Sequence, residues 1–521
     1  MTSAYYQYTP LTSENAFRLF RVTKCPLTDD DTPSLVEIEL FEASFDAPPP
    51  FEAVSYAWGG REKDCILACG DSLLPVSATV VDFLIALRRQ HILHPRDLSE
   101  AKPLWIDAIC INQDSVGERN VQVPRMRTIY HEADQVWVWL GRGTVETDIA
   151  FDYLVEKHDS GASQYSYTER DLSTDSAYKN EVVRKRGFYD PVDTDFIVDI
   201  INLPWFGRTW TVQELLLCNS AMILCGSKAM PWLAFASMLN TIQESACNTL
   251  YFLHPSPVSN PVTFYDDISC YHNFGSIFIR SGGISGILTR ARRQEATEPK
   301  DKVYGLYGII EHAKLPKVDY DYTVQRIYTD TTVAALRYDP TVDVLHQTCL
   351  QPIISHLPSW VPDWSNAAFI QPFPRVLSIV LADPRQLEQL HQNVQSHESY
   401  LGVVKDYREL FGLSGDTNEW SYELIKHLVL RLHSTEISIL QHDISLFTYQ
   451  RTLFTTRNGY MGIGPRWMKP GDKVVAFSGY NVPFILREAH EYYKLLGPAY
   501  IDRMMKWEHR DGKKAGIITL V

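Results

Sequence analysis

The sequence has little that would mark it as secreted, membrane-spanning or metal-binding. Its nine cysteines are an odd number, and Cys65 and Cys69, the closest two, have no second pair or nearby histidine to complete a zinc site. No apolar run approaches the roughly 18 residues of a membrane span. The first seven residues carry neither a basic nor an apolar stretch, so we expect no secretory signal. We therefore expect a reduced, cytoplasmic protein without a metal centre.

A surplus of positive charge is also missing. Lysine and arginine number 49 against 63 aspartates and glutamates, which gives a formal net charge of −14. Binding to nucleic acid or to an anionic membrane depends on a basic surface, so we expect neither as a partner. Hydrophobic residues make up 45% of the 521 residues, which is ordinary for a globular chain of two to four domains.

Sequence signatures of several enzyme classes are absent as well. The chain has no GxxxxGK[ST] phosphate loop, no GxSxG nucleophile elbow, no HExxH metal helix and no EF-hand loop. The glycine-rich stretch 282–286 follows no convincing strand, and we interpret it as a flexible connection before a helix. No single motif therefore identifies a reaction.

What the sequence does contain is an alternation of short apolar runs with helical periodicity. Apolar runs this continuous are typical of strands buried on both faces of a mainly parallel sheet. We predict an α/β fold with these strands in one sheet and the helices flanking it. The predicted strands lie at 51–56, 104–109, 135–140 and 220–225, and the predicted helices at 79–89, 123–133 and 205–217.

The rest of the chain divides by its patterning. A polar insertion at about 143–200 lacks an apolar face, so we expect it to be exposed and mobile. Asn458-Gly459 and Lys469-Pro470-Gly471-Asp472 predict turns of a small antiparallel unit near the end of the chain. The predicted parts are an N-terminal β extension (1–50), the α/β domain with its insertion (51–226), a mainly helical region (227–350), a mixed region (351–445) and a β-rich unit (446–521).

Four segments, in this order, together resemble the fungal heterokaryon-incompatibility (HET) domain: Phe51–Gly59, Leu104–Gln113, Glu118–Gly141 and Arg208–Leu215. Downstream, Glu298–Leu306 and Leu357–Trp364 are similar to segments that follow the domain in full-length members. One departure is Pro124, which stands where the family usually has a helical residue. We expect it to move the start of that helix to about Val123, because proline is tolerated at the first helical position.

The resemblance implies a role in fungal non-self recognition, in which the domain triggers growth arrest or cell death. It implies an incompatibility partner protein and self-association. HET domains are similar in fold to TIR domains, several of which cleave NAD+, so a TIR-like fold is expected and NAD+ is a candidate substrate, with no bound cofactor. A non-catalytic interaction scaffold, or an accessory protein in another pathway, is the alternative interpretation.

The TIR resemblance also implies a catalytic carboxylate. Trp210 and Glu214 are four residues apart, which places both on one face of a helix. In the analogy Glu214 stabilises the oxocarbenium-like state that forms as nicotinamide leaves. The alternatives are that Glu214 is a solvated or salt-bridged helix residue, and that Trp210 is a core anchor rather than a stacking platform.

Candidate substrate-binding residues follow the first strand, at the sheet edge where open α/β folds bind ligands. Glycines there let a pyrophosphate approach, an arginine can pair with it, and aromatic rings can stack. These residues are Ser55, Tyr56, Trp58, Gly59, Gly60 and Arg61, with Asp107 one strand over. Alternatively, Ser55 and Tyr56 satisfy hydrogen bonds at the strand end, Asp107 caps a helix or pairs with an arginine, and Asn112-Gln113 forms a turn.

Overall fold

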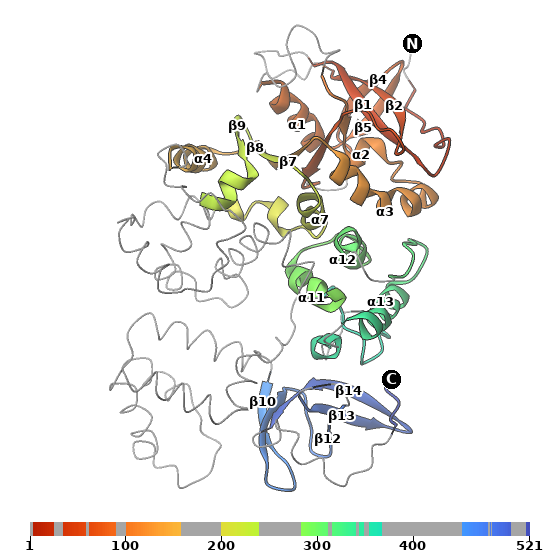
Figure 1. Cartoon of the computed structure of the whole chain (residues 1–521), viewed down its shortest axis with the longest axis vertical. Coiled ribbons are helices and arrows are strands. Elements are labelled where there is room, and N and C mark those ends of the chain that lie inside the picture. Colours follow the sequence, from red (N-terminus) through yellow and green to blue (C-terminus); the bar gives the residue numbers. More distant parts are fainter. Residues whose placement is uncertain are drawn as a thin grey trace. The chain divides into compact units, whose positions relative to one another are not determined.

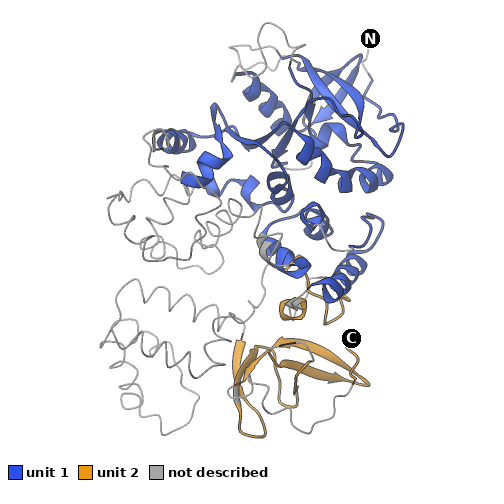
Figure 2. Ribbon diagram, viewed as in Figure 1, with its two compact units in different colours: residues 1–340 blue, residues 341–521 orange. Residues whose placement is uncertain are grey.

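The protein is described from a computed structural model, which divides into two units, residues 1–340 and 341–521 (Figure 2). Each unit is described by itself. The structure describes residues 4–25, 35–58, 62–89, 101–157, 200–238, 283–310, 315–339, 343–348, 354–366, 451–477, 480, 482–501 and 517–521.

The first unit, which contains strands β1 to β9, several of them labelled in Figure 1, is built on one sheet. This nine-stranded sheet has the order β5-β4-β2-β1-β6-β3-β7-β8-β9. Its centre consists of β6 (Leu104–Trp105), β3 (Glu52–Tyr56), β7 (Gln135–Gly141) and β8 (Ala221–Cys225). Each of these strands is parallel to its neighbour among the four. The predicted parallel core of the fold is therefore confirmed.

Strands on either side extend this centre into a mixed sheet. β1 (Ala16–Lys24) pairs antiparallel with both β2 (Glu37–Ser44) and β6, so the N-terminal strands belong to the same sheet. β4 (Cys65–Cys69) and β5 (Ser72–Val76) form a hairpin, and Gly70 at its turn has φ of +58°, which favours glycine. β9 (Lys228–Pro231) pairs antiparallel with β8.

Both faces of the sheet are covered, as the continuous apolar strands predict. Trp137 and Trp139 of β7 belong to a core with α1 (Ala78–Arg89) and α3 (Val116–Glu132). Val138 and Leu140, which alternate with them, pack in a second core with α4 (Val145–Lys157) and the 3₁₀ helix η3 (Pro204–Gly207). Side chains of a strand point alternately to its two faces, so one strand anchors both layers.

Three predicted elements differ from the structure. The strand predicted at 104–109 ends at Trp105, and the short helix α2 (Asp107–Cys110) follows it. Pro124 lies inside α3, whose start is set by Ser115 at the N-cap: the Ser115 side chain accepts a hydrogen bond from the backbone N–H of Glu118. The helix predicted at 205–217 is divided into η3 and α7 (Thr211–Leu216).

The first part of the expected polar insertion belongs to the packed fold. Its first residues form α4, which buries Ala150, Phe151 and Leu154 in the second core together with Ile200 and Ile201. The expectation that this stretch has no apolar face is therefore wrong for residues 145–157. Residues 158–199 lie outside the described residues, so the prediction that they are mobile stays a prediction.

The described residues from 283 to 339 are mostly helical. They comprise α11 (Gly283–Arg290), η4 (Ala291–Arg293), α12 (Asp301–Tyr304), η5 (Tyr307–Ile309) and α13 (Val324–Tyr338). Within the described part of the chain, no helix is both long and apolar enough to span a membrane.

The second unit contains two three-stranded antiparallel sheets and the 3₁₀ helix η6 (Asp343–Gln347). Gly459 and Gly471 have φ of +82° and +99° at the two predicted turns. The predicted β-rich end of the chain is therefore confirmed. One sheet contains β10 (Arg451–Thr455), β11 (Met461–Pro465) and β15 (Tyr500–Ile501), and the other β12 (Lys473–Val475), β13 (Phe484–Ala489) and β14 (Tyr492–Pro498).

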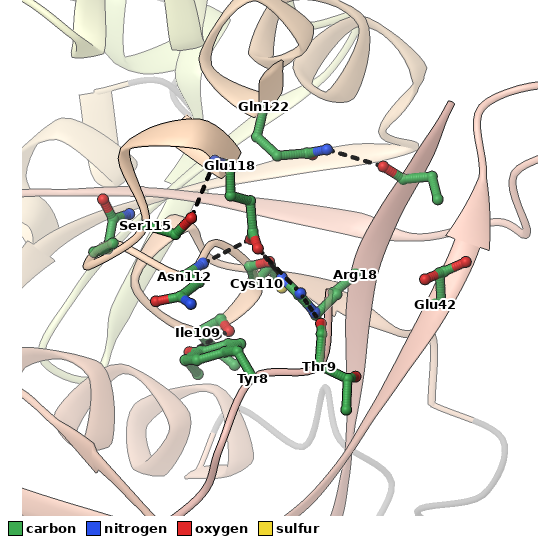
Figure 3. A network of polar contacts seen from close by, with 12 residues as sticks. Tyr8, Thr9, Arg18, Glu42, Ile109, Cys110, Asn112, Ser115, Glu118 and Gln122 are labelled. Carbon is green, nitrogen blue, oxygen red and sulfur yellow. Dashed lines mark hydrogen bonds and ion pairs between the residues drawn. The ribbon is translucent and has the colours of Figure 1, made fainter. Parts of the chain in front are cut away.

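A buried ion pair joins strand β1 to the first turn of α3 (Figure 3). Arg18 lies 2.5 Å from a carboxylate oxygen of Glu118, and their side chains are only 5% and 11% exposed. Arg18 also donates to the backbone oxygens of Cys110 and Thr9. Glu118 also accepts from the backbone N–H of Asn112. The pair thus fixes both ends of the turn between α2 and α3.

We predict that Arg18→Met lowers the stability of this unit by about 3–5 kcal/mol, because it leaves the Glu118 carboxylate buried without its counter-ion. Lys24→Met is the matched control on the same strand. Its pair with Glu37 is exposed, with side chains 62% and 42% accessible, and is worth at most about 1 kcal/mol. Urea unfolding of both variants beside the wild type checks this, and equal losses would contradict it.

Candidate functional site

The carboxylate of Glu214 meets the end of β3 inside the first unit. The hydroxyl of Ser55 donates a short hydrogen bond to Glu214 Oε2 and accepts one from the indole nitrogen of Trp205 at 2.8 Å. The Tyr130 hydroxyl, which donates to the Val54 carbonyl at 3.1 Å, also lies within hydrogen-bonding reach of Glu214. Strand β3 and helix α3 therefore meet the Glu214 side chain, and η3 supports it through Ser55.

Burial dominates the electrostatics of this carboxylate. Glu214 is 6% exposed, and the loss of water raises its pKa to about 7. The hydrogen bond from Ser55 and the positive charge of Arg208 act in the opposite direction, whereas the nearby Asp107 raises the pKa further. The group therefore exchanges its proton near neutral pH, as a general acid or base must.

A second carboxylate lies close by. Asp107 begins α2, immediately beyond the carboxyl end of β6, and burial raises its pKa. Its Oδ2 accepts from the indole of Trp58 at 3.1 Å, its Oδ1 accepts from the backbone of Ala108 at 2.8 Å, and the Tyr56 hydroxyl is hydrogen-bonded to it. The negative charge of Asp107 raises the pKa of Glu214, so the two carboxylates lie near each other.

Arg208 supplies the positive charge of the site. It lies between η3 and α7, donates to the Tyr56 carbonyl at 2.8 Å and stands over the Trp58 ring at 5.9 Å. Its charge lowers the pKa of both Glu214 and Asp107. A guanidinium beside an indole ring can pair with an anionic group and support a stacked planar one.

The structure brings together most of the residues predicted from the sequence. Ser55, Tyr56, Trp58, Asp107 and Glu214 share one network at the carboxyl end of β3 and β6. Trp210 does not share this network: its indole lies within hydrogen-bonding reach of Asp301 instead. Gly59, Gly60 and Arg61 lie outside the described residues.

The pair Asn112-Gln113 shapes the turn that follows the short helix α2, which begins at Asp107. The Gln113 side chain donates to the Asp107 carbonyl at 3.0 Å, and the Asn112 backbone donates to Glu118 at 2.8 Å. The Tyr8 hydroxyl donates to the Ile109 carbonyl at 2.8 Å at the other end of α2 (Figure 3). These contacts correspond to the turn interpretation of the pair.

Sequence reasoning missed three residues of the site: Arg208, Trp205 and Tyr130. Arg208 opens one of the four HET-like segments, so its place in the motif was a usable signal. Trp205 and Tyr130 read as apolar core positions, and both are indeed buried. Only their polar atoms, which are directed at Ser55 and Val54, connect them to the site.

Comparisons with known proteins agree with this architecture. Residues 51–214 match the family described as Heterokaryon incompatibility protein (HET), and residues 382–515 match the Het-6 beta-barrel domain. The chain is also 23% identical to "Heterokaryon incompatibility protein 6, OR allele" of Neurospora crassa, over 91% of this chain and 92% of that protein. These matches identify the chain as a fungal HET-domain protein. No solved structure matches it, so the similarity to TIR domains stays an expectation.

The raised pKa of Glu214 predicts a specific pH dependence. A free glutamate has a pKa of about 4.3, so between that pH and about 7 the folded protein holds this proton more tightly than the unfolded chain does. The resulting stability is fully present below the unfolded pKa and is lost as pH rises through 7.

We therefore expect the stability of the wild type, relative to Glu214→Gln, to fall by about 3 kcal/mol between pH 4.5 and 7.5. Urea unfolding of both proteins across this range measures the difference and cancels the titration of all other groups. A difference that does not change with pH would show that Glu214 does not titrate in this window.

Proposed function

We propose that this protein acts in heterokaryon incompatibility, the recognition of non-self between fungal cells. The support is the similarity to heterokaryon incompatibility protein 6, which extends over 91% of this chain, together with the matches to both a HET domain and a Het-6 barrel. In this role the HET domain would be activated by an incompatibility partner and by self-association, and would lead to growth arrest or cell death.

We further propose that the HET domain acts by cleaving NAD+. The observation that carries this is the pairing of the Glu214 and Asp107 carboxylates beside Arg208 at the carboxyl end of two parallel strands. Loss of nicotinamide from NAD+ breaks an N-glycosidic bond and leaves positive charge on the ribose. A carboxylate held in a poorly solvated site stabilises that charge far better than it would in water.

The residues divide naturally between the two halves of the substrate. Glu214 would face the ribose, because its proton exchanges near neutral pH. Arg208 would pair with the pyrophosphate, and Trp58, which is only partly buried, would stack on a ring. Tyr56 and Ser55 would orient the two carboxylates through their hydroxyl groups.

The burial of Glu214 is the reason why activity would depend on binding to a partner or to a second copy. Glu214 is 6% exposed, and protein donors occupy its carboxylate. A substrate can reach it only after Ser55 or its neighbours move. Binding of a partner or of a second copy would supply that rearrangement by favouring the open state.

The same burial favours a second candidate function, a non-catalytic interaction scaffold. A buried carboxylate with protein donors is also what a purely structural polar network requires. In that case Glu214 would hold α7 against β3, and the domain would act through its surface alone.

Only the catalytic function would form products from NAD+, so product formation separates it from the scaffold. We expect the purified full-length protein to release nicotinamide, with a rate per molecule that rises with protein concentration. Glu214→Gln should lower turnover by about 10²- to 10³-fold while the protein stays folded, because the amide keeps the shape but cannot carry the charge. Chromatography of nicotinamide and a thermal melt measure the two effects.

Glu52→Gln is the matched control, since Glu52 is a carboxylate at the other end of β3 that accepts from the Trp137 indole at 2.7 Å. It should keep wild-type turnover. A folded Glu214→Gln protein with wild-type turnover would remove the catalytic role. Absence of nicotinamide from the wild type at every concentration would favour the scaffold.

A further inference from the structure

The residues that follow the HET match pack along the segment that carries Arg208 and Glu214. We call residues 294–309 the docking segment. Its Glu295 carbonyl accepts from the backbone of Thr209 at 2.9 Å, and its Glu295 N–H donates to the Gly207 carbonyl at 2.5 Å. This bridge lies at the break between η3 and α7, so it accounts for the division of the helix predicted at 205–217.

A polar cluster forms the middle of this contact. The Asp301 carboxylate accepts from the Tyr320 hydroxyl at 2.8 Å and lies within hydrogen-bonding reach of the Trp210 indole. The guanidinium of Arg119, on α3, stands over the Tyr320 ring at 4.5 Å and pairs with Glu298 at 3.6 Å. The partly buried Trp210 thus joins the HET domain to the docking segment.

Two glycines show how closely the surfaces approach. A Cβ added at Gly305 would lie 3.2 Å from the Thr209 side chain and 3.3 Å from the Trp210 ring. A Cβ at Gly308 would lie 2.7 Å from the side-chain oxygen of Gln213, which accepts a hydrogen bond from the Gly308 N–H at 3.1 Å. Gln213 immediately precedes Glu214, so this contact is one residue from the proposed catalytic carboxylate.

We propose that the docking segment positions the catalytic helix: it holds α7 so that Glu214 reaches Ser55 and Arg208 reaches Tyr56. Asp301 and Gly308 are its positioning residues, and neither touches the site itself. The functional unit therefore extends from the HET match through residue 309. The part of this inference that concerns turnover rests on the proposed NAD+ cleavage, and the part that concerns the mobility of α7 does not.

Two glycines provide a matched test in the full-length protein. Gly308→Ala inserts a methyl group against Gln213, whereas Gly286→Ala inserts one where nothing lies within 4 Å. Asp301→Asn is the second test variant, because it removes a charge-assisted acceptor without adding volume. Hydrogen exchange of residues 208–217, compared with that of β7, reports whether α7 alone is released.

We expect Gly308→Ala and Asp301→Asn to speed exchange in 208–217 by about tenfold or more while β7 keeps its protection. Gly286→Ala should exchange like the wild type. Unchanged exchange in 208–217 for both test variants, or equal loosening of β7, would overturn the proposal.

Nicotinamide release is the second readout. Both test variants should lower kcat more than they raise KM, because a misplaced Glu214 weakens the transition state more than substrate binding. Full turnover in a variant with a mobile α7 would overturn the positioning role. A wild type without turnover would refute the proposed function alone, and the exchange result would still decide whether the docking segment holds α7.

Discussion

The burial of one carboxylate organises the centre of the first unit. Burying an ionised glutamate without partners costs several kcal/mol, so the Glu214 carboxylate can be buried only where hydrogen-bond donors surround it. Ser55 supplies one from β3, Tyr130 lies within reach on α3, and Trp205 in turn holds Ser55 from η3. The same contacts that make the burial tolerable bring a strand and three helices to one point, and they oppose the burial, which raises the pKa of the carboxyl to about 7.

The stretch that matches the HET family, residues 51–214, does not hold this arrangement alone. Arg18, which precedes the match, binds the Cys110 carbonyl and so secures the short helix that presents Asp107. Glu295, which follows the match, bridges to Thr209 and secures the segment that presents Arg208 and Glu214. Each carboxylate of the site is therefore supported by a part of the chain outside the family match. The first unit accordingly includes residues on both sides of the match.

In the proposed function, the burial of the site would connect its chemistry with its role in recognition. A carboxylate pair that could cleave NAD+ would be harmful if it were always accessible, and Glu214 is 6% exposed in this conformation. Under the proposed function, the protein would remain inactive until it meets an incompatibility partner. Protein donors that occupy the carboxylate would keep the site inaccessible until then, since any opening must first replace their hydrogen bonds. The Ser55–Glu214 contact would then be the interaction that the proposed activation has to break.

Local patterns in the sequence determined the strands β3, β7 and β8, the helix α1 and the place of Ser55, Tyr56 and Asp107 at one sheet edge. Periodicity and strand direction are properties of a few neighbouring residues, and so is the N-cap at Ser115, which starts the helix about eight residues ahead of Pro124. The tertiary structure alone decided that Trp210 turns to Asp301, that Arg208 reaches Tyr56, and that the helix predicted from 205 breaks at the bridge to Glu295. These contacts pair buried polar groups that are far apart in the sequence. Such pairs follow no repeat, so a short stretch of sequence does not predict them.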